Sequence, residues 1–158
     1  MTECEKKFLI SPPPESFLKA AEKIRITQSY LAPPEGFDTA RVRFSSCGDK
    51  AEYTHTLKRF VSGFTRVEEE ARITPSEYEA LLKNRISVIE KTRYVLPHGG
   101  HVLEIDVYPF MREAVLEIEL SREDESYVIP DWINVIKDVS SDPEYTNARL
   151  AEKFGSVK

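Results

Sequence analysis

Charged residues recur at every second position in three successive runs between residues 87 and 121. The pairs are Lys91 and Arg93, then Glu104 and Asp106, then Glu117 and Glu119. Because successive side chains of a β-strand point to opposite faces, each pair lies on one face of its strand. In the last run the opposite face is wholly apolar, with Ala114, Leu116, Ile118 and Leu120. The sequence therefore predicts a sheet with one apolar face and one densely charged face.

The same alternation extends through the earlier part of the chain. Strands are predicted over residues 3–10, 26–32, 39–45, 52–60 and 64–73. Their charged positions are Glu3, Glu5, Lys7, Arg41, Arg43, Lys58, Arg66, Glu68, Glu70 and Arg72. Turn-forming segments at 47–50 and 97–100 favour hairpins, and therefore antiparallel pairing. Such a sheet can stay open with its charges in solvent, or close into a barrel whose charges line a polar lumen.

Three amphipathic segments interrupt the strands. Helices are predicted over residues 15–24, 74–83 and 143–154. The second begins with a capping box, in which Thr74 and Glu77 flank a proline at the first helical position. We expect these helices to cover the apolar outer face of a closed sheet. A chain of 158 residues is expected to form a single domain, residues 1–158.

Composition limits the partners that this chain can have. Its net charge of −5 argues against a surface for nucleic acid or anionic membranes. No apolar run approaches the roughly 18 residues of a membrane span, and residues 1–10 lack the apolar core of a signal peptide. Cys4 and Cys47 do not resemble a secreted disulfide framework, so reduced thiols are expected. These features predict a cytoplasmic protein without nucleic-acid or membrane partners.

A closed interior lined by both signs of charge has a limited set of chemical uses. Desolvated charges must be paired or bound, and internal salt bridges are one way to achieve this. The other is a bound polyanion with divalent cations. Lysines and arginines neutralise phosphate oxygens, while carboxylates bind hard cations such as Mg²⁺ or Mn²⁺. Phosphoryl transfer uses these components, but the charge pattern alone leaves both solutions open.

The order of these motifs resembles the CYTH superfamily, also called the triphosphate tunnel metalloenzymes. The opening E-x-E-x-K motif is formed by Glu3, Glu5 and Lys7. The match continues through Arg41-x-Arg43, Thr56-Leu57-Lys58, Arg66-x-Glu68-x-Glu70, Glu90-Lys91-Thr92-Arg93-Tyr94, Asp106, Glu117-x-Glu119 and a final Asp142-x-x-Tyr145-x-Asn147. The segments ITQSYL, TLKR, EKTRY and DPEYTNARLA are most similar to the short bacterial inorganic triphosphatases. One departure is Lys137-Asp138-Val139-Ser140, which stands where E-V-T is usual.

The resemblance implies an α+β fold, a closed antiparallel β-barrel of about eight strands with a charged lumen and helices packed outside. It implies metal-dependent hydrolysis of tripolyphosphate to pyrophosphate and phosphate, with Mg²⁺ or Mn²⁺. The phosphate-binding residues would be Lys7, Arg41, Arg43, Lys58, Lys91 and Arg93. The metal-binding residues would be Glu3, Glu5, Glu68, Glu70, Asp106, Glu117 and Glu119. Lys91 and Tyr30 would act as a catalytic pair on the attacking water, because neighbouring cations lower the pKa of a lysine.

Other functions remain open at this point. A class IV adenylyl cyclase, in the same superfamily, would make cyclic AMP from ATP, but no segment has an evident role in reading the base. Thiamine or nucleoside triphosphates are further substrates for the same chemistry. A non-catalytic polyphosphate binder would bind tripolyphosphate without releasing phosphate. The expected partner in every case is a small-molecule triphosphate, bound by a monomer or a homodimer.

Overall fold

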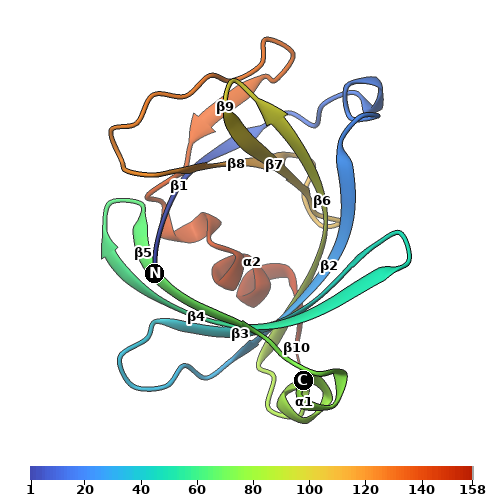
Figure 1. Cartoon of the computed structure of the whole chain (residues 1–158), viewed down its shortest axis with the longest axis vertical. Helices are drawn as coiled ribbons and strands as arrows, with labels where there is room; N and C mark the ends of the chain where they lie inside the picture. The colour runs from blue at the N-terminus through green and yellow to red at the C-terminus, as the bar shows by residue number, and fades with distance from the viewer. Residues whose placement is uncertain (158) are drawn as a thin grey trace.

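The computed structural model describes residues 1–157 as an α+β fold built on one antiparallel β-sheet. Eight strands close into a barrel (Figure 1). In chain order they are β1 (Thr2–Ile10), β2 (Glu22–Leu31), β3 (Thr39–Cys47), β4 (Lys50–Ser62), β5 (Thr65–Arg72), β6 (Ser87–His98), β7 (His101–Val107) and β8 (Ala114–Leu120). Around the barrel the order is β6-β2-β3-β4-β5-β1-β8-β7, and β7 pairs with β6 to close the ring. The predicted closed eight-stranded barrel is therefore confirmed.

Two short strands extend the sheet beyond this ring. β9 (Val135–Asp138) pairs with the second half of β1, and β10 (Ser156–Val157) pairs with β6. Along the same edge of β1, the first three residues pair with β5 instead. The pairing between β1 and β5 is therefore short and ends at Cys4. Further along the same edge, from Phe8, β1 pairs with β9.

The barrel wall separates the charged and apolar faces as the alternation predicts. On β8, Leu116 and Ile118 point outward and are fully buried, while Glu117 between them faces the lumen. The outward face is covered by an irregular segment, from which Tyr127, Trp132 and Ile133 pack against the wall. We expected helices to supply this cover, but on this face the irregular segment supplies it.

The predicted helix over residues 15–24 is wrong. The segment forms one 3-10 turn, η1 (Glu15–Phe17), and β2 then begins at Glu22. Long pairing of β2 with both β3 and β6 requires these residues in extended form, which leaves too few for a helix. Phe17 stacks on Trp132 with a centroid separation of 5.1 Å, so its side chain still packs against the outer layer.

The helix predicted over residues 74–83 is confirmed as α1 (Pro75–Leu82). Its capping box is complete: the Glu77 N–H donates to Thr74 Oγ1 over 3.1 Å, and the Thr74 N–H donates to Glu77 Oε1 over 2.9 Å. The buried Tyr78 packs against Tyr53 of β4, with ring centroids 4.9 Å apart. α1 therefore lies outside the wall of the barrel (Figure 1).

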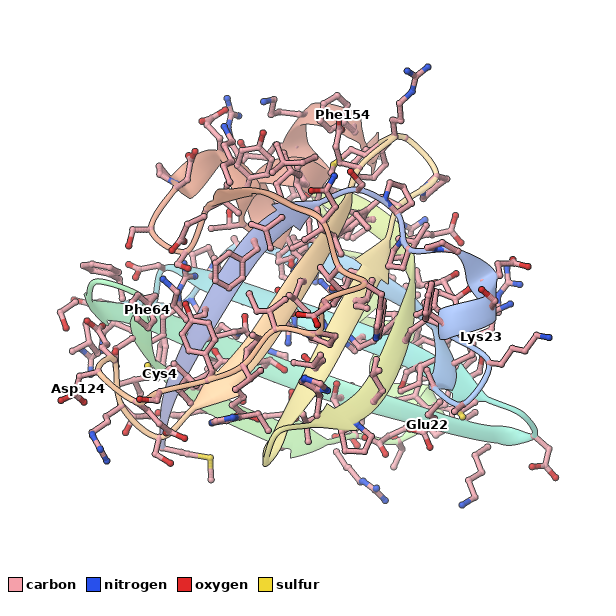
Figure 2. All side chains as sticks on the ribbon, turned by 90° about the horizontal axis from the view of Figure 1, so that it is seen from above. Cys4, Glu22, Lys23, Phe64, Asp124 and Phe154 are labelled. Atoms are coloured by element: carbon pink, nitrogen blue, oxygen red, sulfur yellow. The ribbon has the colours of Figure 1, made fainter. Side chains whose placement is uncertain are left out.

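The last predicted helix, over residues 143–154, is divided in two. A 3-10 turn, η2 (Pro143–Tyr145), precedes α2 (Asn147–Phe154), because Thr146 is extended and caps α2 through its side chain. Figure 2 shows α2, with Phe154 at its end, lying across one end of the barrel. Leu150 and Ala151 pack there with Leu9, Ile89 and Val115. Neither helix among residues 1–157 is long and apolar enough to cross a membrane.

Candidate active site: a charged cavity inside the barrel

A cavity of about 260 Å³ occupies the lumen. Its walls are mainly the inward-facing side chains of the barrel strands, and α2 and the segment before it contribute the rest. Of the residues predicted for the site, those that line it are Glu3, Glu5, Lys7, Tyr30, Arg41, Arg43, Lys58, Glu68, Glu70, Arg93, Glu117 and Glu119. The structure thus brings most of the predicted residues, from seven strands, around one space.

One side of the cavity carries a compact group of carboxylates. Glu5, Glu104 and Glu117 each offer an oxygen, and these oxygens lie within 4.8 Å of one another. Strand register produces the group, because Glu104 is directly opposite Glu117 and the adjacent Glu119 is directly opposite Glu5. Converging carboxylate oxygens are the ligands that hard cations such as Mg²⁺ prefer. The donor set therefore fits a divalent metal.

The members of this carboxylate group differ in their affinity for protons. Burial, together with the nearby carboxylates of Glu117 and Glu3, raises the pKa of Glu5 to about 8. Burial also opposes the charge of Glu117, but Lys7 and Arg93 outweigh it and hold its pKa well below the usual range. At neutral pH the group therefore contains an ionised Glu117 beside a protonated Glu5, and a bound cation would displace that proton.

Arg93 links the carboxylates on this side. Its guanidinium contacts Glu104 at 3.2 Å and Glu117 at 2.9 Å, and it makes two hydrogen bonds to Asp106, of 2.8 and 2.9 Å. Asp106 also accepts a hydrogen bond of 2.7 Å from the Nζ of Lys91. Asp106 and the Lys91 side chain are completely buried and do not line the cavity. Asp106 thus lies behind Arg93 and apart from the three-carboxylate group.

The opposite side of the cavity carries two arginines of β3. Within the described residues neither Arg41 nor Arg43 forms an ion pair, whereas Lys7, Lys58, Lys91 and Arg93 each contact a carboxylate. Arg41 is 8% exposed, and its Nε is a buried donor with no partner among the described residues. Burial, with Arg41 and Arg93 nearby, lowers the pKa of Arg43 to about 10. Buried cations without an ion-pair partner fit an anionic ligand.

Lys58 lies beside these arginines but is paired. Its Nζ is 2.9 Å from Glu3 and 3.4 Å from Glu68. The neighbouring Glu70 accepts a hydrogen bond of 2.8 Å from Thr56, which is buried. Glu3, Glu68 and Glu70 therefore form a second acidic group across the cavity from Glu104, held by a lysine and a threonine.

The proposed catalytic pair is not in direct contact. Within the described chain, Lys91 contacts Asp106 and, at 3.4 Å, Asn147, whereas the Tyr30 hydroxyl accepts a hydrogen bond of 2.9 Å from Gln28. Burial, reinforced by Arg93 and Arg43, lowers the pKa of Lys91 to about 7 despite its contact with Asp106. A lysine with this pKa can exchange protons at neutral pH.

Several cavity residues were not among those predicted. Glu104 shares the alternation of its strand with Asp106, so that pattern was the available signal. Arg66 lines the cavity and forms no ion pair among the described residues, and Asn147 enters from α2. Gln28 does not line the cavity but is hydrogen-bonded to Tyr30 and Arg43, which do, and the charge pattern does not mark it because it is uncharged.

Proteins named inorganic triphosphatase resemble the chain over nearly its whole length. An inorganic triphosphatase of Acetivibrio thermocellus is 32% identical over 155 residues, with 95% of this chain and 93% of that protein covered. One of Nitrosomonas europaea is 34% identical over 161 residues, with 96% and 97% covered. The crystal structure of the inorganic triphosphatase NE1496 matches with a TM-score of 0.59 and 29% identity over 96% of this chain and 95% of that one. No protein-family model matches the chain.

Proposed function

Because the chain belongs to the inorganic triphosphatases, which are hydrolases of phosphoanhydride bonds, we propose that it hydrolyses tripolyphosphate to pyrophosphate and phosphate with Mg²⁺ or Mn²⁺. The observation that carries this proposal is that acidic and basic side chains line opposite sides of one cavity. Three converging carboxylates lie on one side, and two arginines without ion-pair partners lie on the other. A short chain of phosphates, bound with a divalent cation, complements both.

The metal would be held by Glu5, Glu104 and Glu117, with Glu119 beside them. Glu3, Glu68 and Glu70 stay candidates for a contact through water or for a second ion, and Asp106 acts on this site through Arg93. When bound, the metal supplies positive charge that neutralises phosphate oxygens and orients the triphosphate. Lys7 and Arg93, which contact Glu117, keep that carboxylate ionised and correctly turned for this purpose.

The phosphates themselves would be bound by the basic residues of the cavity. Arg41 and Arg43 are the primary anchors, because their charges are not already used by carboxylates. Lys7, Lys58 and Arg93 contribute from the other walls, and Arg66 joins the six residues that sequence reasoning assigned. Lys91 supports them from behind Arg93 through Asp106. Positioning and charge neutralisation of this kind supply most of the catalysis in phosphoryl transfer.

The attacking water needs a group that can accept its proton. Lys91 suits this role because its pKa of about 7 leaves a large neutral fraction at physiological pH. Tyr30 lines the cavity, and its hydroxyl proton is not used in the hydrogen bond that it accepts from Gln28. We assign Tyr30 the placement of the water or of a phosphate oxygen. Lys91 would take the proton through a bridging water, because its Nζ lies behind the cavity wall beside Asn147, which lines the cavity.

The size of the cavity favours an inorganic substrate over a nucleotide. Pockets for drug-sized ligands usually measure about 300–1,000 Å³, and this cavity of about 260 Å³ lies below that range. Its lining is almost entirely charged or hydroxylated, and its aromatic members are Tyr30 and Phe64. These features support tripolyphosphate rather than ATP or thiamine triphosphate.

A substrate panel tests the proposal. Purified protein is incubated with tripolyphosphate, ATP or thiamine triphosphate, each with Mg²⁺, Mn²⁺ or a chelator, and phosphate, pyrophosphate and cyclic AMP are measured. Metal-dependent release of phosphate and pyrophosphate from tripolyphosphate is expected. Cyclic AMP as the main product from ATP would replace the proposal with a cyclase, and tight tripolyphosphate binding without turnover would replace it with a binder.

The cellular setting forms part of the same proposal. The free Cys4 and Cys47 are consistent with a reducing compartment, and we propose a cytoplasmic monomer or homodimer that acts on a small molecule alone. Fractionation of cells and measurement of the molar mass in solution test these two points.

A further inference from the structure

Gln28 is an uncharged side chain of β2 that is hydrogen-bonded to two residues of the charged cavity, Arg43 and Tyr30. It is completely buried, and both ends of its amide are hydrogen-bonded. Its Oε1 accepts from the Nε of Arg43 at 3.0 Å and from the Nη2 at 2.6 Å, while its Nε2 donates to the Tyr30 hydroxyl at 2.9 Å. A guanidinium has only donors, so the oxygen must face Arg43 and the nitrogen must face Tyr30. Gln28 therefore fixes the direction of both neighbours.

The strand register gives Arg43 an uncharged partner where several other cations of the lumen have a carboxylate. Gln28 is directly opposite Arg43 on the adjacent strand. At three comparable places a cation of the lumen is directly opposite a carboxylate: Lys7 faces Glu117, Lys58 faces Glu68, and Arg93 faces Asp106. Only the pair with Gln28, among these four, holds its cation without cancelling the charge. Three N–H groups of Arg43 remain for a ligand, since two of its five donors bind Gln28.

We propose that Gln28 is a positioning residue for triphosphate binding, which holds Arg43 in place while leaving its full positive charge available to the phosphates. The inference rests on the proposed function, since it assumes that the ligand is a triphosphate. A glutamate at this position would accept the same two hydrogen bonds but would neutralise Arg43. It would also fail to donate to Tyr30, because a carboxylate has no proton to give at neutral pH.

The test is a double-mutant cycle in which binding affinity, and not the rate of hydrolysis, is measured. The affinity for tripolyphosphate is measured by calorimetry in the presence of a chelator for the wild type, Gln28→Glu, Arg43→Gln and the double variant. We expect Gln28→Glu to weaken binding by about tenfold or more, which is the scale of one charge-assisted contact. The double variant should bind within about twofold of Arg43→Gln, because the effect of Gln28 passes through Arg43.

The control and the melting temperature separate positioning from a merely structural role. Arg25→Gln changes the net charge by the same amount on an exposed residue of the same strand, and should leave the affinity unchanged. Gln28→Glu should melt no lower than the wild type, because it keeps the acceptor and adds an ion pair with Arg43. If Gln28→Glu does not fold, Gln28→Met serves instead: it keeps the volume, removes all three hydrogen bonds of the Gln28 side chain and should weaken binding severalfold.

Three results would overturn the inference. Wild-type affinity in Gln28→Glu, or in Gln28→Met where that variant replaces it, would show that Arg43 needs no such partner. A full additional loss in the double variant would show that the new carboxylate repels the ligand directly. A wild type that binds no tripolyphosphate in the presence of the chelator, and releases no phosphate from it with Mg²⁺ or Mn²⁺, would remove both the inference and the proposed function. If the wild type binds tripolyphosphate but releases no phosphate with Mg²⁺ or Mn²⁺, the proposed function fails and the cycle still decides the role of Gln28.

Discussion

Lys7 and Glu117 lie directly opposite each other on β1 and β8, and the lysine Nζ is 3.3 Å from the glutamate Oε2. The same carboxylate contacts Arg93 and belongs to the three-carboxylate group. The Glu117 carboxylate thus contacts two of the phosphate-binding cations and also belongs to the proposed metal site. Its removal should weaken the binding of both phosphate and metal.

Glu117→Gln should therefore reduce kcat by about 100-fold or more, since it removes a metal ligand and an ion-pair partner together. The measurement is phosphate release from tripolyphosphate under saturating Mg²⁺. Glu79→Gln, an equal change on an exposed residue of α1, serves as the control and should be fully active. Activity within threefold of wild type in Glu117→Gln would contradict the assignment.

Metal binding should release a proton below about pH 8. The raised pKa of Glu5 means that its folded carboxyl is protonated at neutral pH, so a cation must displace that proton. Affinity for Mg²⁺ should rise with pH, by up to about tenfold per pH unit, and level off above pH 8. Calorimetry in two buffers of different ionisation enthalpy counts the protons. Glu5→Gln, which mimics the protonated form, should lose this dependence along with most of the affinity.

Replacement of Asp106 by asparagine should affect both stability and the pH profile. Two buried cations, Lys91 and Arg93, would lose their shared carboxylate, a loss that typically costs roughly 3–5 kcal/mol. Since the Asp106 charge raises the pKa of Lys91, its removal should lower that pKa further below 7. The acidic limb of the activity profile should then move to lower pH. A limb that stays in place would exclude Lys91 as the base.

Arg41→Gln should weaken substrate binding more than it destabilises the fold. Burial opposes the Arg41 charge, but Tyr30, Glu68 and Glu3 outweigh it and raise the pKa of this guanidinium, so its removal should lower the melting temperature only slightly. KM for tripolyphosphate should rise by about tenfold or more, as expected for a lost charge-assisted contact. Arg72→Gln is the matched control, because Arg72 lies on the exposed end of β5 and pairs with Glu52.

Gly63→Ala should destabilise the turn between β4 and β5. Gly63 has a φ of +49°, and an added Cβ would lie 2.6 Å from Glu123 Oε1. The Glu123 side chain accepts hydrogen bonds from the Phe64 N–H and from Thr65, so it is not free to move away. A loss of about 1–3 kcal/mol is expected from thermal unfolding. Adding Glu123→Ala to this variant should recover less than the full loss, because the backbone strain would remain.

The residues alone predict the strands and the faces on which their side chains lie, because strand alternation is a local property, whereas closure into a barrel was predicted from the family resemblance. Residues two apart, such as Glu117 and Glu119, share a face wherever the strand lies. Depth along the lumen is not local, since it depends on strand tilt and register. For this reason Lys91 and Asp106, which the family resemblance assigned to the ligand-binding set, lie behind the cavity wall instead.

Two further differences have physical causes of the same kind. The segment after Pro14 has a helical spacing of apolar residues, but the pairing of β2 on both edges takes those residues into a strand. Gln28 carries no charge, so its importance emerges only from the hydrogen bonds that it makes with Arg43 and Tyr30. Strand pairing and hydrogen bonds of neutral side chains depend on residues distant in the chain, so a single sequence predicts them poorly.

The position of α2 has a consequence for longer substrates. Leu150 and Ala151 fill one end of the barrel together with Leu9, Ile89 and Val115, so the lumen is closed at that end. A long polyphosphate cannot thread through it and could insert only its terminus, leaving the remainder in bulk water. Cleavage in a lumen closed at one end would remove phosphate from the end of the chain, and the internal phosphoanhydride bonds would not reach the site.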